Sequence, residues 1–146
     1  MLVSFEGSTL VDWTVYAKAR GELGSGFVRI LGYFREDGVK SVGAIETAMR
    51  AQSAAQMVIP AHTLKGEARQ FGAEPLAALA EEIETIARDC VETRDTPSTA
   101  LPLVVKLRPL FDGTLALLDR EASPLAERRP AVGGFGRRTP TMFGQR

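Results

Sequence analysis

The chain has 146 residues and a formal net charge of zero at pH 7, with 18 basic and 18 acidic side chains. Its single cysteine, Cys90, excludes an internal disulfide framework, and with a single histidine the chain has too few soft ligands for a typical zinc site. No apolar run approaches the roughly 20 residues that span a bilayer, and residues 1–8 lack a signal-peptide pattern. We therefore expect a cytoplasmic protein without a membrane segment or a metal site.

Charge is distributed unevenly along the chain. Residues 1–121 carry 13 basic and 17 acidic side chains, whereas residues 122–146 carry five basic and one acidic. The acidic body argues against nucleic acid as a partner. Proline, glycine and arginine dominate the final segment, which predicts a disordered basic tail. We thus expect an N-terminal extension (1–9), a folded domain (10–121) and a tail (122–146).

Apolar residues recur at helical spacing almost throughout, and no stretch shows convincing period-2 alternation. The expected helices cover residues 12–20, 25–36, 39–52, 54–71, 75–91 and 102–121. Asp37-Gly38 predicts a turn between the second and third of these, Gly72 predicts the end of the fourth, and Pro109 predicts a bend in the last. The pattern predicts an all-α fold, an antiparallel four-helix bundle with a short additional N-terminal helix.

The only histidine, His62, lies in the helix expected over residues 54–71. At 100° per residue this helix has one apolar stripe, which we expect to face the core, formed by Met57, Ala61, Leu64, Ala68 and Phe71. His62 lies roughly 140° from the centre of that stripe, so its ring is expected to point to solvent. Lys65, Gly66 and Arg69 share its face.

This face suits a group that carries negative charge. A neutral imidazole is a nucleophile near pH 7, and the cations Lys65 and Arg69 could hold an incoming anion beside His62. Glycine inside a helix costs about 1 kcal/mol relative to alanine, which is reasonable at Gly66 if a partner must approach the ring closely. The alternative interpretation is ordinary: a solvated histidine beside a lysine, with Gly66 serving helix packing.

Two apolar residues, Val58 and Ile59, lie on the same exposed half of the predicted helix. They could form a small apolar docking surface around the histidine. Pro60 leaves two possibilities open, because it either kinks this helix or starts it. If Pro60 starts the helix, Val58 and Ile59 leave the helical face.

The run of residues 61–68 reads Ala-His-Thr-Leu-Lys-Gly-Glu-Ala, and Phe71-Gly72-Ala73 and Leu76 follow it. With the acidic helical segment at residues 79–84 and the all-α context, this pattern resembles the histidine-containing phosphotransfer (HPt) proteins of bacterial two-component phosphorelays. The resemblance extends over about residues 10–120. It implies a four-helix bundle that carries an exposed phosphoacceptor histidine.

The resemblance also implies roles for single residues. His62 would accept the phosphoryl group through Nε2, Lys65 would offset the phosphate charge, and Gly66 would leave space for the receiver domain. Glu84 occupies the position on the facing helix where related domains place a carboxylate on the other ring nitrogen. The alternative for Glu84 is a solvated glutamate in an acidic helix. Arg69 and Arg88 are candidates for phosphate or partner contact.

The implied partners are response-regulator receiver domains and sensor histidine kinases, hybrid ones included, and we expect the protein to be a monomer. No cofactor is expected on this chain, because the receiver domain would supply Mg²⁺. The sequence contains no ATP-binding glycine motif, so we expect a phosphocarrier rather than an enzyme. The alternative function is a helical adaptor that binds a receiver or kinase without carrying phosphate.

Overall fold

The computed structural model describes residues 9–122, and these form five α-helices and two short 3₁₀ turns without a strand among them. The helices are α2 (Trp13–Leu23), α3 (Phe27–Arg50), α4 (Ala54–Gln70), α5 (Glu74–Thr93) and α6 (Leu101–Ala122). The 3₁₀ turns, Gly24–Gly26 and Ser98–Ala100, precede α3 and α6. Residues 1–8 and 123–146, which include nearly all of the predicted extension and tail, lie outside the described part of the chain.

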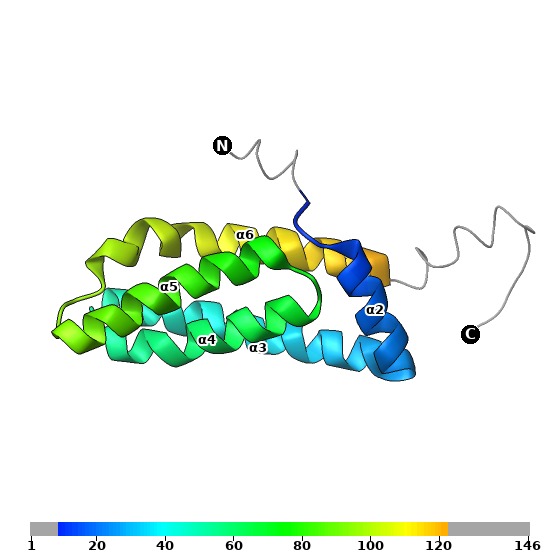
Figure 1. Ribbon diagram of the computed structural model, residues 1–146, viewed down its shortest axis with the longest axis horizontal. Coiled ribbons are helices and arrows are strands. Elements are labelled where there is room, and N and C mark those ends of the chain that lie inside the picture. Colours follow the sequence, from blue (N-terminus) through cyan, green and yellow to red (C-terminus); the bar gives the residue numbers. More distant parts are fainter. Residues whose placement is uncertain (1–8, 123–146) are drawn as a thin grey trace, which may run out of the picture.

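Helices α3 to α6 lie side by side and alternate in direction, and α2 crosses one end of the bundle (Figure 1). The predicted all-α, antiparallel four-helix bundle with a short additional N-terminal helix is therefore confirmed. Every residue of the apolar stripe predicted for the histidine helix is buried, with no exposed surface. No helix within residues 9–122 is long and apolar enough to cross a membrane.

The prediction of a turn at Asp37-Gly38 is wrong, because α3 continues through both residues as one helix of 24 residues. Gly38 is buried, and the ring of Phe111 on α6 occupies the space that a side chain here would fill. A Cβ at Gly38 would lie 2.5 Å from the Phe111 Cζ atom. The glycine therefore serves close packing of α3 on α6 rather than a turn.

The two prolines inside the helices do not end them. The hydroxyl of Ser53 caps α4 by accepting a hydrogen bond of 3.2 Å from the backbone N–H of Gln56. Helix α4 therefore begins well before Pro60, and this settles the position of Val58 on the helix. Pro109 likewise lies inside α6, which continues on both sides of it.

The turn between α4 and α5 is built on Gly72, as its sequence predicts. Its φ of +79° lies in the left-handed region that favours glycine, and the N–H of Ala73 donates back to the carbonyl of Ala68 at 2.9 Å. The Gly72 carbonyl accepts a 2.7 Å bond from the N–H of Asp12, the cap of α2. The start of α2 is thereby attached to the corner where α4 and α5 meet.

Candidate functional site

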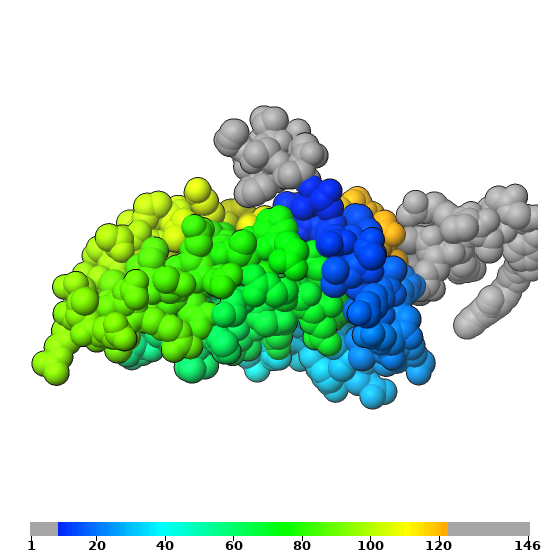
Figure 2. Space-filling view, in the orientation of Figure 1, coloured from blue at the N-terminus to red at the C-terminus, as the bar shows by residue number. Residues whose placement is uncertain are grey.

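His62 lies near the middle of α4 and points out of the bundle. Its neighbours Ala61 and Leu64 are fully buried, whereas 57% of the His62 side chain is exposed. This orientation follows from the helical period, since a residue next to a buried one is rotated by about 100°. Helices α4 and α5 form the broad face that is turned toward the viewer in Figure 2.

The ring of His62 contacts a buried carboxylate on the neighbouring helix. Oε2 of Glu84, on α5, lies 2.9 Å from Nδ1 of His62. Glu84 is only 5% exposed, although Glu81 and Glu82, three and two residues before it, lie at the surface. The solvated position that the sequence left open for Glu84 is therefore not the one it has.

Two cations hold the same carboxylate. The Lys65 ammonium on α4 forms an ion pair of 2.9 Å with Oε1 of Glu84. Arg88, one turn along α5, donates from Nε to Oε2 at 2.9 Å, and its Nη2 forms an ion pair of 2.8 Å with the same oxygen. Lys65 and Arg88, which the sequence offered as phosphate or partner contacts, are therefore both engaged with Glu84.

These contacts decide the protonation of the carboxyl group and of the ring. Burial by itself would raise the pKa of Glu84, but the donors Lys65, Arg88 and His62 outweigh it and lower this pKa to about 2. An ionised carboxylate can only accept hydrogen bonds. The facing Nδ1 of His62 must therefore carry a proton, and in the neutral ring this leaves the lone pair on Nε2.

Gly66 lies at the surface beside this cluster. A Cβ added to it would meet no atom within 4 Å among the described residues, so the fold does not require glycine here. The interpretation of Gly66 as a helix-packing residue thus has no support in the described part of the chain. Glycine at this position keeps open space next to the ring.

Arg69 lies near the C-terminal end of α4 and does not join the Glu84 cluster. Its guanidinium pairs with Glu81 at 3.0 Å and with Glu74 at 3.5 Å, and all three side chains are about half exposed. Exposed pairs of this kind contribute little to stability. Arg69 follows His62 by seven residues, about two turns along the same helix, and there it bridges α4 and α5.

Comparison with known proteins identifies the family and the fold. Residues 29–120 match the Hpt domain family. The chain belongs to that family. A solved structure, the crystal structure of histidine-containing phosphotransfer protein B (HptB) from Pseudomonas aeruginosa, is similar with a TM-score of 0.68 and 24% sequence identity. The match covers 78% of this chain and 95% of the HptB chain, and it shows a shared fold. None of the curated proteins matches the chain.

This Hpt domain has a groove beside the histidine, between the first half of α4 and the last half of α5. The groove has a volume of about 440 Å³ and is lined by Ala55, Val58, Ile59, Arg88, Val91 and Glu92. Ile59 is 67% exposed and Val91 is 45% exposed. Val91 was missed from the sequence, although it follows Arg88 by three residues and so shares its helical face.

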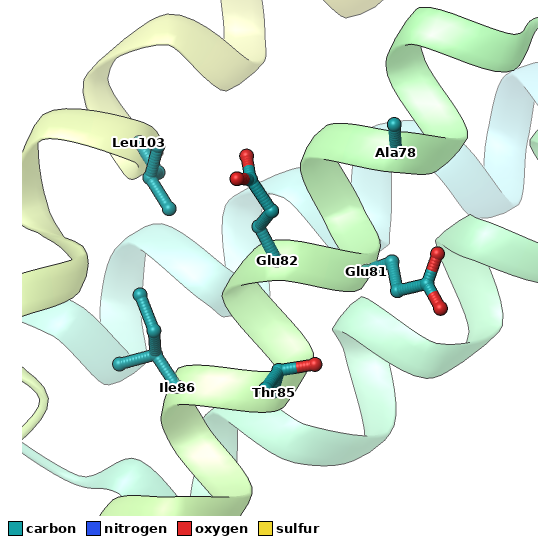
Figure 3. Close-up of a pocket in the computed structure, with 6 residues that line it drawn as sticks. All are labelled: Ala78, Glu81, Glu82, Thr85, Ile86 and Leu103. Carbon is teal, nitrogen blue, oxygen red and sulfur yellow. The ribbon is translucent and has the colours of Figure 1, made fainter.

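A second groove follows the other side of α5, between α5 and α6 (Figure 3). Its volume is about 540 Å³, and in Figure 3 Glu82, Ile86 and Leu103 border it where the two helices diverge. It holds no member of the Glu84 cluster. The chemistry of this domain therefore concentrates on the α4–α5 side.

A second acidic group lies between α4 and α3. Burial and the nearby carboxyl group of Asp37, on α3, raise the pKa of Glu67 to about 7. The sequence contained no signal for this pair, because Asp37 and Glu67 belong to different helices. Within residues 9–122 no cluster of three or more His, Cys, Asp or Glu side chains could hold a metal ion.

Proposed function

We propose that this protein is a phosphocarrier of a bacterial two-component phosphorelay and that His62 is its phosphoacceptor. The observation that carries the proposal is the 2.9 Å contact between Nδ1 of the exposed His62 ring and the buried Glu84 carboxylate. This contact orients the ring and directs the lone pair of Nε2 away from the bundle. Membership of the Hpt domain family supports the phosphoryl group as the cargo.

The proposed reaction is a direct displacement. The Nε2 lone pair attacks the phosphorus of an aspartyl phosphate on a receiver domain, and the aspartate oxygen leaves with the electrons of the broken P–O bond. The product ring carries phosphate on Nε2, a proton on Nδ1 and a positive charge that the ionised Glu84 balances. In the reverse step a receiver aspartate attacks phosphorus, and the electrons of the P–N bond return to Nε2.

No proton has to move in either direction, because Nδ1 keeps its proton throughout. The chain supplies an oriented nucleophile on a rigid scaffold, while the receiver would supply Mg²⁺ and most of the groups that stabilise the transferring phosphoryl. The protein is thus proposed to be a carrier and not an enzyme in its own right. A sensor kinase is the other proposed phosphate donor.

The groove beside the histidine is proposed to be part of the docking surface for the receiver. Val58, Ile59 and Val91 offer it apolar contact, and the open space at Gly66 lies on the same helix as the ring. Apolar patches of this kind with a charged rim are typical of transient protein–protein contacts. The docked receiver would then bring its aspartate toward Nε2.

The decisive experiment is phosphotransfer profiling against the receiver domains of the same organism. A phosphorylated receiver with Mg²⁺ should label this protein in an acid-labile, base-stable form, and His62→Gln should remove the label. Circular dichroism should show that His62→Gln remains folded, because the ring is mostly exposed. Labelling that persists in His62→Gln contradicts the proposal. Tight receiver binding without any labelling of the unaltered protein would favour the adaptor function instead.

A further inference from the structure

The guanidinium of Arg88 contacts the carboxylate that holds the histidine ring. Arg88 follows Glu84 by one turn of α5; its Nε donates to Oε2, the same oxygen that faces Nδ1 of His62, and its Nη2 forms an ion pair with that oxygen. Lys65 holds the other oxygen, Oε1, from α4. The carboxylate is therefore held at both oxygens by cations from two helices.

A glutamate has three side-chain torsions, so a single contact to the ring would leave several rotamers open. Nε of Arg88 donates to the oxygen that also meets Nδ1, and Nη2 pairs with that oxygen. Together with Lys65 on the other oxygen, the guanidinium therefore favours the orientation in which the carboxylate contacts the ring. We propose that Arg88 is a positioning residue, which holds Glu84 on Nδ1 of His62 and thereby keeps Nε2 unprotonated for attack on phosphorus. Its meaning for transfer depends on the function proposed above, although the geometry can be tested without phosphate.

The alternative role for Arg88 is contact with the partner, because its side chain is 55% exposed and borders the groove beside the ring. The two roles differ in what a substitution changes. Loss of positioning lets Glu84 leave Nδ1, so that the proton moves to Nε2 in part of the population and the rate of transfer falls. Loss of a docking contact weakens receiver binding and leaves the ring as it is.

The ring nitrogens can be observed directly, since the chain has one histidine and its ¹⁵N signals need no assignment among several. The variants are Arg88→Gln, which removes the cation, Arg88→Lys, which keeps it, and Arg108→Gln as the matched control. Arg108 is a partly exposed arginine on α6 that, like Arg88, pairs with a glutamate, here Glu46 on α3. Measurements are made on the whole protein at a pH where the ring is neutral.

In the unaltered protein we expect the proton on Nδ1. Arg88→Gln should increase the share of rings protonated on Nε2 and slow transfer on the order of 10-fold, as loss of an orienting partner does elsewhere, with the KM for the phosphorylated receiver unchanged. Arg88→Lys should restore both quantities in part, and Arg108→Gln should change neither.

An unchanged tautomer in Arg88→Gln together with a raised KM would overturn the proposal and assign Arg88 to docking. An unchanged tautomer with an unchanged KM would overturn it as well. If Arg88→Gln shifts the tautomer but the unaltered protein never accepts phosphate, the positioning role stands and the phosphocarrier function fails. The two proposals can thus fail separately.

Discussion

The two halves of the bundle are built in contrasting ways. In the site half, α4 and α5, a buried ionised carboxylate, Glu84, contacts His62 and Lys65 across the helix interface and pairs with Arg88 on its own helix. In the scaffold half, α3 and α6, the buried polar residues Ser41 and Thr114 are uncharged. Charges pair outside the core, as in the two hydrogen bonds of Arg108 with Glu46, at 3.0 and 2.7 Å. Both pairs of helices bury apolar side chains, and of the two pairs only α4 and α5 also bury a charged one.

The boundary between the halves sharpens this contrast. Glu67 on α4 faces Asp37 on α3, and there burial and a neighbouring acid raise the pKa to about 7. Glu84 is more deeply buried, yet its cations bring its pKa to about 2. Burial alone would raise both values. At Glu84 the neighbouring donors outweigh burial, whereas at Glu67 burial and the Asp37 carboxyl group both raise the pKa.

The largest effect is expected in the site half. Glu84→Gln removes the charge that fixes the Nδ1 proton, so transfer to or from His62 should slow on the order of 10- to 100-fold. The bundle should remain folded, because glutamine has the same shape. The rate is measured by quenching transfer from a labelled receiver at successive times. An unchanged rate would show that the ring needs no carboxylate.

The scaffold half should respond in the opposite sense. A methyl group at Gly38 overlaps the Phe111 ring, so Gly38→Ala should lower the free energy of unfolding by about 1 to 3 kcal/mol while the transfer rate of folded protein is unchanged. Gly43→Ala is the control on the same helix, since nothing lies within 4 Å of its Cβ. There helix propensity should raise stability by up to about 1 kcal/mol. Urea unfolding distinguishes the two; equal changes would contradict the packing role of Gly38.

A smaller effect is expected between the halves and depends on pH. Because the pKa of Glu67 is raised from 4.5 to about 7, the folded state keeps a proton that the unfolded state releases in this window. Stability should therefore fall as the pH rises from about 4.5 to 7. Glu67→Gln should remove this loss and be the more stable form at pH 8, as unfolding curves at several pH values would show.

Glu84 provides the opposite pH dependence for comparison. Its pKa is lowered from 4.5 to about 2, so its contribution is complete above pH 4.5 and is lost as the pH falls toward 2. Glu84→Gln should flatten the acid side of the stability profile and leave the side near neutrality as it was. If both glutamine variants flatten the same side, the contrast between the two glutamates is wrong.

The smallest effect is expected for the exposed pairs of Arg69 with Glu81 and Glu74. Arg69→Gln should change the free energy of unfolding by less than about 1 kcal/mol, and high salt should reduce the difference further. Thermal melts at low and high ionic strength measure this. A loss as large as that for Gly38→Ala would place Arg69 in the framework of the bundle.

Much of this fold could be read from periodicity. The spacing of Met57, Ala61 and Leu64 identified the buried stripe of α4, and it placed His62 outside that stripe. The helix end at Gly72 followed from its chemistry, because few other residues adopt its φ. The division into extension, domain and tail stays a prediction. The stripe and the helix end depend on residues that are close together in the chain, so they can be predicted from the sequence.

Other features depend on residues that are far apart in the chain. The sequence predicted a turn at Gly38, because aspartate and glycine together favour one; only the arrival of Phe111 from α6 explains why glycine continues the helix. The helical projection also placed Lys65 on the face of His62, but it could not show that Lys65 pairs with Glu84 on another helix.

The amino-acid sequence by itself determined an all-α bundle with one exposed histidine, since helical period and side-chain polarity are local properties. Only the tertiary structure decided that Glu84 is buried, that Lys65 and Arg88 both pair with it, and that Nδ1 of His62 is the nitrogen it holds. The physical reason is that protonation and tautomer depend on distances between helices, and these distances exist only once α4 and α5 have packed.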